Sequence, residues 1–282
     1  MKRAGFANVA ITGATSGIGR AVAVRLAELG AGNVFFCGRD PVRIAETEAA
    51  VRALGANARG ARLDVADAAA VRAWLEECDR AAPLDLVFAN AGVAAGGRED
   101  DEEAVRQVFA ADVGGVLNTV LPALDLYRRP GGPERAARRI AITSSMTAYH
   151  GMPQCPAYSA AKACVKAWGA GLRGRLRREG ISVTVVCPGF VRSRITDANT
   201  CPMPFFWEAP RAASAICRGI ARGRGLVAFP LPMRLACWFL GALPECVSER
   251  VFRLLPEKSR PLPDQVFATR ISDHRVVGRG ER

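Results

Sequence analysis

The most informative stretch of the chain reads Thr12-Gly13-Ala14-Thr15-Ser16-Gly17-Ile18-Gly19. It follows a short apolar segment, residues 6–12, and opens a segment with helical character, residues 17–29. The glycines permit a tight turn and let the backbone approach a phosphate closely. A helix that begins at such a turn offers free N–H groups and the positive end of its dipole to an anion. The stretch therefore predicts a strand, a phosphate-binding turn and a helix, in that order.

Apolar strand-like segments and helical segments alternate along the rest of the chain. The expected strands are residues 6–12, 33–37, 58–63, 84–89, 139–143, 181–187 and 226–229. The expected helices are residues 17–29, 41–54, one that opens at Asp67, a long one over 99–128, and 156–179, which ends at Gly180. This alternation predicts an α/β fold, a doubly wound parallel sheet of about seven strands with helices on both faces. Ligand sites of such folds lie at the carboxyl ends of the strands.

Length and composition set the wider limits. The 282 residues, 50% of them hydrophobic, are enough for one domain over residues 1–256, followed by a tail over 257–282 that we expect to be extended or poorly ordered. The net charge of +12 is spread along the chain without a nucleic-acid-binding motif, so we expect no nucleic-acid partner. Two histidines give no basis for a metal site.

The number and placement of the cysteines indicate the cellular compartment. The nine cysteines form no C-x-x-C pair, and several lie in apolar stretches, for example Cys37, Cys164 and Cys187. We interpret them as reduced, buried thiols of a cytoplasmic protein. The apolar stretch 231–247 is interrupted by Arg234, Pro244 and Glu245, so it is not expected to span a membrane. It is expected either to contact a membrane surface or to pack in the core or at a subunit interface.

A tyrosine and a lysine indicate proton-transfer chemistry. Tyr158 and Lys162 are four residues apart in an expected helix, so they share one face. The ammonium group favours the phenolate and is expected to lower the pKa of Tyr158 from about 10. Such a phenol can protonate a carbonyl oxygen or deprotonate an alcohol. Ser144 and Ser145, at the end of the expected strand 139–143, are candidates to hold that oxygen.

The pattern T-G-x-x-x-G-x-G resembles the cofactor turn of the classical short-chain dehydrogenase/reductase family. The resemblance extends over about residues 6–230 and includes Asp64-Val65, Asn90-Ala91-Gly92 and Pro188-Gly189, each after an expected strand. It implies a Rossmann-type oxidoreductase that transfers hydride to or from a nicotinamide cofactor. The cofactor-binding residues that it implies are Thr12, Gly13, Thr15, Ser16, Gly17, Ile18, Gly19, Arg39, Asp64, Val65, Asn90, Ala91, Gly92, Tyr158, Lys162, Pro188, Gly189, Val191 and Ser193.

The same resemblance assigns catalytic roles. Ser145 precedes Tyr158 by the 13 residues typical of the family's catalytic serine, with Ser144 as the alternative. Lys162 is implied to hold the nicotinamide ribose as well as to assist Tyr158. Alignment on Gly115 places Asp112 where the family has an asparagine that holds a proton-relaying water. Asp112 is therefore either a working variant, which would add negative charge near Lys162 and raise the pKa of Tyr158, or a sign of altered activity.

The end of the second expected strand bears on the choice of cofactor. An acidic residue there would bind the ribose 2′-hydroxyl of NAD, whereas this chain has Gly38-Arg39-Asp40. Arg39 can bind a 2′-phosphate through paired hydrogen bonds, so we expect NADP. Asp40 is expected to cap the following helix at Pro41, although a shift in register would make it a ribose ligand.

The segment after Pro188-Gly189 is expected to form a substrate lid over about residues 192–222. It contains Met203, Phe205, Phe206 and Trp207, which suit an apolar ketone, aldehyde or alcohol, or else ordinary packing. The resemblance implies a homodimer or homotetramer. Two other functions stay open: a non-catalytic NADP-binding regulator or scaffold of the same fold, and an epimerase or dehydratase of the family's extended relatives.

Overall fold

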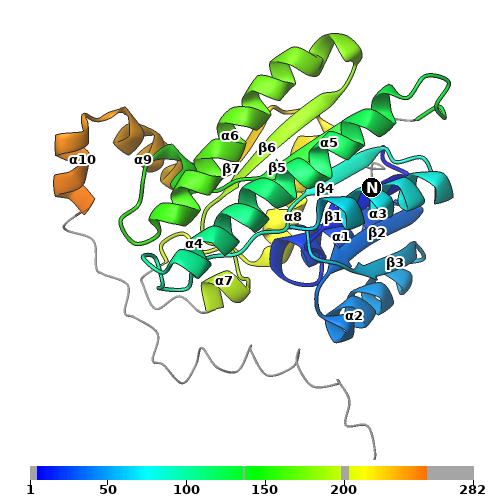
Figure 1. The fold of residues 1–282 in the computed structure, drawn as a ribbon, viewed down its shortest axis with the longest axis horizontal. Helices are drawn as coiled ribbons and strands as arrows, with labels where there is room; N and C mark the ends of the chain where they lie inside the picture. Colours follow the sequence, from blue (N-terminus) through cyan, green and yellow to red (C-terminus); the bar gives the residue numbers. More distant parts are fainter. Residues whose placement is uncertain (1–4, 136, 198–202, 253–282) are drawn as a thin grey trace, which may run out of the picture.

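The computed structural model describes residues 5–135, 137–197 and 203–252 of the chain. Its centre is one all-parallel sheet in the order β3-β2-β1-β4-β5-β6-β7 (Figure 1). The strands are β1 (Asn8–Thr12), β2 (Asn33–Gly38), β3 (Asn57–Arg62), β4 (Leu86–Ala89), β5 (Arg139–Thr143), β6 (Ser182–Pro188) and β7 (Leu226–Phe229). The predicted doubly wound α/β fold is confirmed. The strand order reverses between β1 and β4, so ligands are expected at the carboxyl ends of these strands.

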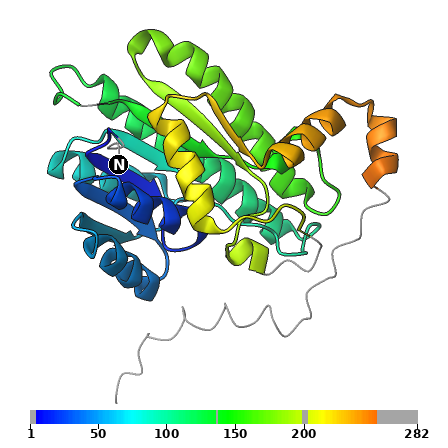
Figure 2. The ribbon, with the colours of Figure 1, turned by 180° about the vertical axis from the view of Figure 1, so that it is seen from behind.

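Helices cover both faces of the sheet (Figures 1 and 2). On one face α3, α5 and α6 enclose a core cluster with β4 and β5, and on the other α1 and α8 enclose a second cluster with β1 and β2. The helices are α1 (Gly17–Glu28), α2 (Pro41–Arg52), α3 (Ala68–Ala81), α4 (Glu102–Phe109), α5 (Gly115–Arg128), α6 (Pro156–Leu176), α7 (Arg194–Asp197), α8 (Ala209–Ala221), α9 (Leu231–Ala242) and α10 (Glu245–Phe252). Short helical turns are η1 (Ala110–Gly114), η2 (Met146–Tyr149) and η3 (Arg177–Glu179).

Local signals in the sequence set several helix ends. Asp40 caps α2 by accepting hydrogen bonds from the N–H groups of Val42 (3.0 Å) and Arg43 (3.3 Å). Asp67 caps α3 in the same way through Ala70 N–H (2.9 Å). Side-chain oxygens at these positions satisfy N–H groups that have no partner within the helix. Gly180 ends the α6–η3 segment with a φ of +69°, which glycine adopts without steric cost.

The long helix predicted over 99–128 differs from the observed segment. It begins at Glu102, because Asp101 caps it by accepting from Ala104 N–H (2.8 Å), and it is interrupted by the π-helical turn η1. Residues 102–128 are long and apolar enough to cross a membrane by length and composition, but half of their most apolar window is buried in the fold. Burial in the fold therefore explains why residues 102–128 are apolar.

Two other expectations need correction. Residues 209–221 of the expected lid form α8, whose Ala212, Ala213 and Ile216 are buried in the core cluster with α1, so only residues 192–208 stay as a candidate lid. Cys164 is exposed on α6, whereas Cys37 and Cys187 are buried as expected. Residues 198–202 and the predicted tail 257–282 lie outside the described residues.

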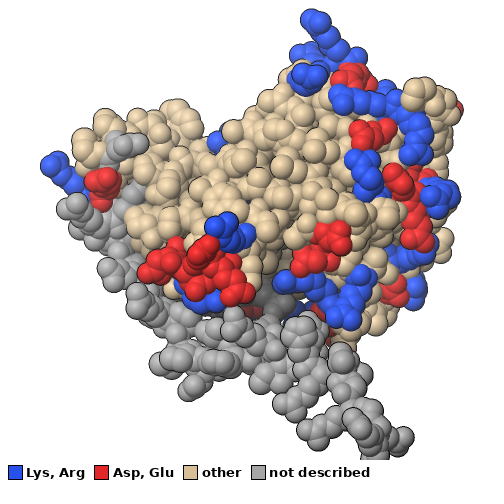
Figure 3. All heavy atoms as spheres, in the orientation of Figure 1, with Lys and Arg blue, Asp and Glu red and all other residues tan. Residues whose placement is uncertain are grey.

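The surface charge is mixed rather than concentrated. Over the side of the molecule formed by α2, β3 and α3, basic side chains lie beside acidic ones (Figure 3). Arg59 pairs with Glu77, and Arg72 lies 3.0 Å from Asp125. Pairing of this kind lowers the field that a nucleic-acid backbone would meet.

Candidate active site

The glycine turn joins β1 to α1 at the carboxyl edge of the sheet. Gly13 and Gly17 have φ values of +67° and +51°, which other residues rarely adopt. A Cβ on Gly13 would lie 2.6 Å from Ala91 Cα, and one on Gly19 would lie 2.4 Å from the Gly13 carbonyl oxygen. Among the described residues, no side chain caps the first turn of α1. The turn therefore leaves N–H groups free for an anion, as a dinucleotide pyrophosphate requires.

The close packing at Gly19 predicts a large effect of a small substitution. Gly19→Ala should lower the free energy of unfolding by about 1–3 kcal/mol, because the added methyl group meets Gly13 and Asn90. Gly171→Ala is the matched control, since Gly171 is exposed in α6 and no neighbouring group lies within 4 Å of the place that a Cβ would take. It should be neutral or stabilising by about 0.5–1 kcal/mol. Urea unfolding measures both, and equal effects would contradict this explanation.

Asn90 ties together the carboxyl ends of three strands. Its Nδ2 donates to the carbonyl oxygens of Thr12 (3.1 Å) and Gly13 (3.2 Å), and its Oδ1 accepts from Thr143 Oγ1 (3.1 Å). Thr12 Oγ1 in turn accepts from the N–H groups of Asn90 (3.0 Å) and Ala91 (3.2 Å). The predicted Asn90-Ala91-Gly92 segment is thus part of a polar network that fixes the glycine turn.

The loop after β3 is held against α5. Asn118 Nδ2 donates to the Val65 carbonyl oxygen (2.9 Å), and a Cβ on Gly115 would lie 2.5 Å from Val65 Cγ2. Asp64 Oδ1 accepts from Ala66 N–H (2.9 Å). The contact with Val65 gives Asn118 a structural role. The loop also lies near the carboxyl end of β2, because Leu63 N–H donates to the Gly38 carbonyl oxygen (3.0 Å) and Arg39 Nη1 lies 3.8 Å from Asp64 Oδ2.

The structure distinguishes the two candidate serines. Ser144 Oγ donates to the Lys162 carbonyl oxygen (2.8 Å), so its hydroxyl holds α6 against β5. Ser145 instead lies beside the Tyr158 hydroxyl, whose pKa it lowers. Lys162 Nζ lies 5.5 Å from the centre of the Tyr158 ring. The fold therefore brings Ser145, Tyr158 and Lys162 together, as the sequence predicted.

Asp112 forms a buried ion pair with Lys162. The distance from Asp112 Oδ2 to Lys162 Nζ is 3.0 Å, and both side chains are at most 2% exposed. Val93 N–H donates to Asp112 Oδ1 (2.7 Å), and Lys162 Nζ donates to the Thr143 carbonyl oxygen (3.2 Å). A Cβ at Gly92 would lie 3.0 Å from Asp112 Oδ1. The sequence indicated that Asp112 adds charge near Lys162; it gave no sign of Val93 or of the π-helical turn that carries Asp112.

Burial is the largest influence on the pKa of Tyr158. It raises the pKa of Tyr158 above its ordinary value, even though Lys162 lowers that pKa. Asp112 acts in the same direction as burial. Burial alone would lower the pKa of Lys162, but Asp112 and Tyr158 raise it overall, so Lys162 stays protonated. The expected lowering of the Tyr158 pKa is therefore wrong for the protein in this structure.

The segment after β6 lies against the glycine turn. A Cβ on Gly17 would lie 2.8 Å from Ser193 Cβ, which places Ser193 beside the start of α1. Gly189 N–H donates to the Phe229 carbonyl oxygen (2.8 Å), and Val191 is buried and forms a β-bridge with Trp207. The segment that holds Pro188, Gly189, Val191 and Ser193 thus runs from β6 to the glycine turn, which Ser193 contacts.

The carboxyl end of β2 carries the residues expected to select the cofactor. A Cβ on Gly38 would lie 2.4 Å from Thr15 Cγ2, so an acidic side chain there would displace Thr15. Arg39 is 67% exposed, with its Nη1 3.8 Å from Asp64 Oδ2. Asp40 is engaged in capping α2, so Arg39 is the exposed cation of the Gly38-Arg39-Asp40 segment.

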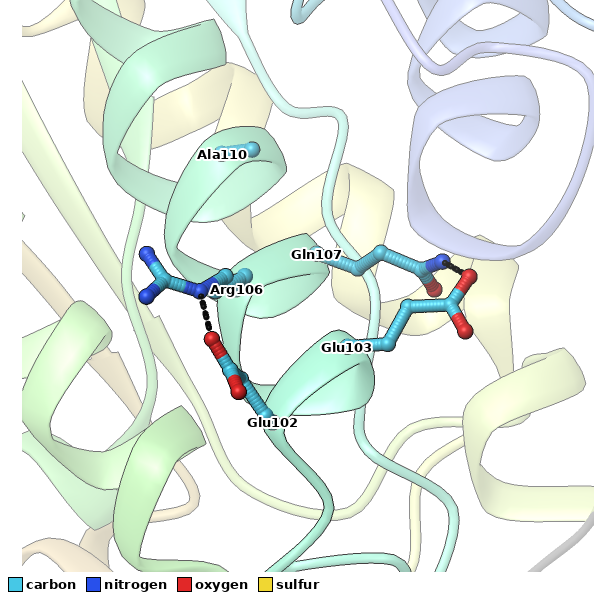
Figure 4. Close-up of a pocket in the computed structure, with 5 residues that line it drawn as sticks. All are labelled: Glu102, Glu103, Arg106, Gln107 and Ala110. Carbon is cyan, nitrogen blue, oxygen red and sulfur yellow. Dashed lines mark hydrogen bonds and ion pairs between the residues drawn. The ribbon is translucent and has the colours of Figure 1, made fainter.

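A surface hollow on α4 is separate from these residues. It is lined by Glu102, Glu103, Arg106, Gln107 and Ala110 (Figure 4). Arg106 Nε donates to Glu102 Oε1 (2.7 Å), and Gln107 Nε2 donates to Glu103 Oε1 (3.1 Å). These side chains bond to one another along one face of α4, which explains why they lie together. None of the predicted site residues lines the hollow.

Comparisons with known proteins agree with this geometry. A family profile described as short chain dehydrogenase matches residues 7–201. An uncharacterised oxidoreductase of Myxococcus xanthus is 35% identical over 245 residues, which cover 84% of this chain and 94% of that protein. A Streptomyces violaceoruber protein that carries the name of a ketoacyl reductase of the granaticin polyketide synthase is 35% identical over 190 residues, or 66% of this chain and 68% of that protein.

Solved structures show the same fold. The crystal structure of a short-chain dehydrogenase/reductase from Burkholderia phymatum in complex with NAD has a TM-score of 0.73 and 28% identity, and covers 83% of this chain and 92% of that one. A short-chain dehydrogenase of Mycobacterium paratuberculosis bound to NAD has a TM-score of 0.68 and 25% identity, and covers 80% of this chain and 97% of that one. The glycine turn, the serine, tyrosine and lysine at one strand edge, and these matches together show that the chain belongs to the short-chain dehydrogenase family of oxidoreductases.

Proposed function

We propose that this protein interconverts a carbonyl and an alcohol, with NADP(H) as the hydride carrier and Tyr158 as the general acid and base. The observation that carries the proposal is the contact of Ser145 with Tyr158, and of Asp112 with Lys162, at the edge of the sheet where the glycine turn lies. The nicotinamide, when bound, supplies or accepts the hydride. In this proposal Ser145 holds the substrate oxygen and orients the phenol.

The remaining predicted residues fit a dinucleotide. The free N–H groups at the start of α1 suit the pyrophosphate, and in this proposal Asp64 and Val65, on the loop after β3, line the adenine site. Lys162, held protonated by Asp112, can donate to ribose hydroxyls and stabilise the phenolate of Tyr158. In this proposal Ser193, which lies beside Gly17, binds the nicotinamide carboxamide.

NADP is favoured over NAD by the carboxyl end of β2. The exposed Arg39 offers paired donors to a 2′-phosphate, and Gly38 offers no carboxylate to a 2′-hydroxyl. The two solved relatives hold NAD. The NAD in those structures is a property of those proteins. For this protein, residues 38–40 are the basis for proposing NADP.

The substrate is proposed to be apolar. Phe205 is 56% exposed in the candidate lid, and the Trp207 ring stacks on Phe229 with 4.8 Å between ring centres. The name of the Streptomyces violaceoruber relative points to acyl ketones as one substrate class. Exposed Phe109 and Leu121, on the helices that flank Asp112, suit the homodimer or homotetramer that we expect.

Substitution of Asp112 should change the pH dependence of the reaction. Asp112→Asn removes a negative charge that raises the pKa of Tyr158, so that pKa should fall. Oxidation uses the phenolate, so the rising limb of log kcat/KM against pH should move to lower pH. Reduction uses the phenol, so its falling limb should move the same way. Asp125→Asn, exposed on α5, is the control, and identical profiles for the two variants would contradict the role of Asp112.

A screen for NADPH consumption tests the proposed function. The panel contains aldehydes, ketones, quinones and acyl ketones, and NADPH affinity is measured separately by fluorescence titration. We expect turnover with at least one apolar carbonyl. Tight NADPH binding without turnover across the panel would instead favour the non-catalytic regulator or scaffold.

A further inference from the structure

Helix α9 is apolar apart from Arg234, yet none of its residues is buried. Its inner face contains the half-buried Met233, Cys237 and Leu240. Its outer face contains large side chains that are 57–62% exposed and recur at helical spacing: Leu231, Leu235, Trp238 and Phe239. We call these four residues the outer stripe. Four large apolar side chains exposed along one face of a helix normally have an apolar surface against them, so the outer stripe indicates a missing contact.

The helix is firmly placed despite this exposure. Figures 1 and 2 show α9 and α10 as an arm at one end of the molecule. A Cβ on Gly241 would lie 2.5 Å from the Tyr149 carbonyl oxygen, and one on Gly189 would lie 2.5 Å from Met233 Sδ. His150 Nε2 lies 2.9 Å from Ser248 Oγ, which joins η2 to α10. The outer stripe is therefore a fixed surface of the folded protein.

The size of α9 limits what can cover it. A helix of 12 residues is about 18 Å long and about 10 Å across. The outer stripe is thus much smaller than the roughly 800 Å² per partner that a stable protein interface buries. The helix is also too short to cross a bilayer, which needs about 20 residues. Its length and exposure suit a helix that lies in the headgroup region of a lipid surface.

The chemistry of the arm favours anionic lipid. Leucine, tryptophan and phenylalanine are the residues that interfacial helices insert, and tryptophan prefers the bilayer–water boundary. The charged residue of α9 is the exposed Arg234, and the whole chain carries +12. Helix α10 carries Glu245, Glu249 and Arg250, so α9 and α10 together have no net charge. The preference for anionic lipid therefore rests on Arg234, which lies beside the outer stripe, and on the net charge of the chain. The visible part of the arm is mainly uncharged in Figure 3. We propose that the outer stripe of α9 docks on the surface of an anionic lipid bilayer.

Docking in this way would bring the proposed active site close to the membrane. Helix α9 packs against η2, which begins directly after Ser145, and its Met233 packs against Gly189. An apolar carbonyl dissolved in the bilayer would then have a short path to Tyr158. This last step rests on the proposed function, whereas docking itself does not.

Vesicle binding tests the docking. The full chain is mixed with vesicles of phosphatidylcholine and phosphatidylglycerol, or of phosphatidylcholine alone, and the bound fraction is measured by flotation. We expect binding to the anionic vesicles that falls as salt is added. Leu235→Gln with Trp238→Gln should weaken it roughly tenfold or more. Val42→Gln with Leu54→Gln, two exposed apolar side chains near α2, is the matched control and should bind like the unmodified chain.

Two outcomes would overturn the proposal. One is equal vesicle binding by the outer-stripe variant and the control variant. The other is a smaller oligomer for the outer-stripe variant in light scattering, since a second copy of the chain would then be what covers α9. NADPH affinity and turnover of a water-soluble carbonyl are measured on the same samples. If the outer-stripe variant loses vesicle binding but keeps turnover, the loss is due to α9 alone. If vesicle binding is retained but no turnover is found, the proposed function is wrong and the docking is not.

Discussion

Tyr158→Phe is expected to lower kcat by roughly 10²–10⁴-fold while leaving the affinity for NADPH unchanged. The substitution removes one hydroxyl, the group that makes the side-chain contact with Ser145 and that would exchange a proton with the substrate oxygen. The ring and its contact with Lys162 are retained, so the cofactor cleft should keep its shape. Stopped-flow and steady-state measurements of NADPH oxidation, together with NADPH titration, give the two quantities.

Tyr149→Phe is the matched control for this experiment. Tyr149 lies in η2, close to the same site, and Lys166 Nζ is 4.1 Å from the centre of its ring. Tyr149 thus has a lysine of its own beside its ring, as Tyr158 has Lys162, but it makes no contact with Ser145 among the interactions described. Removal of the Tyr149 hydroxyl should leave kcat for a water-soluble carbonyl essentially unchanged. Full turnover by Tyr158→Phe, or equal losses in both variants, would exclude Tyr158 as the proton donor.

Arg39→Asp is expected to reverse the cofactor preference. Two charge-assisted hydrogen bonds to a 2′-phosphate are worth roughly 3 kcal/mol or more together, so kcat/KM for NADPH should fall by roughly 10²-fold. The new carboxylate would also repel the phosphate and could accept from the 2′-hydroxyl of NADH, whose kcat/KM should rise. Because Gly38 is packed on Thr15, the exposed position 39 is the place where this exchange can be made without disturbing the glycine turn.

Arg72→Asp controls for the change of charge. Arg72 lies on α3, is 48% exposed and pairs with Asp125, away from the carboxyl end of β2. It should leave the ratio of kcat/KM values for NADPH and NADH as it is in the unmodified chain. If Arg39→Asp also leaves that ratio unchanged, Arg39 does not select the cofactor, and the assignment of NADP loses its main support.

The sequence by itself determined the strands, the order of the motifs and most helix ends. These features depend on neighbouring residues: apolar runs, the glycine turn, and caps such as Asp40 and Asp67. It also indicated the pairing of Tyr158 with Lys162, because four residues make one helical turn. Length and composition could not define the lid, since the amphipathic pattern of α8 fits a core helix as well as a mobile cover.

Only the tertiary structure decided which side chains of the site contact one another. The spacing to Tyr158 favoured Ser145 over Ser144, but only the fold shows that Ser144 bonds the Lys162 carbonyl oxygen and that Ser145 lies beside Tyr158. Asp112 reaches Lys162 across 50 positions of the chain, from a π-helical turn that no local pattern revealed. Burial then sets the pKa of Tyr158, and burial is a property of the surrounding helices and strands rather than of the Tyr158–Lys162 spacing. Local patterns encode local structure, whereas desolvation and long-range contacts exist only once the chain has folded.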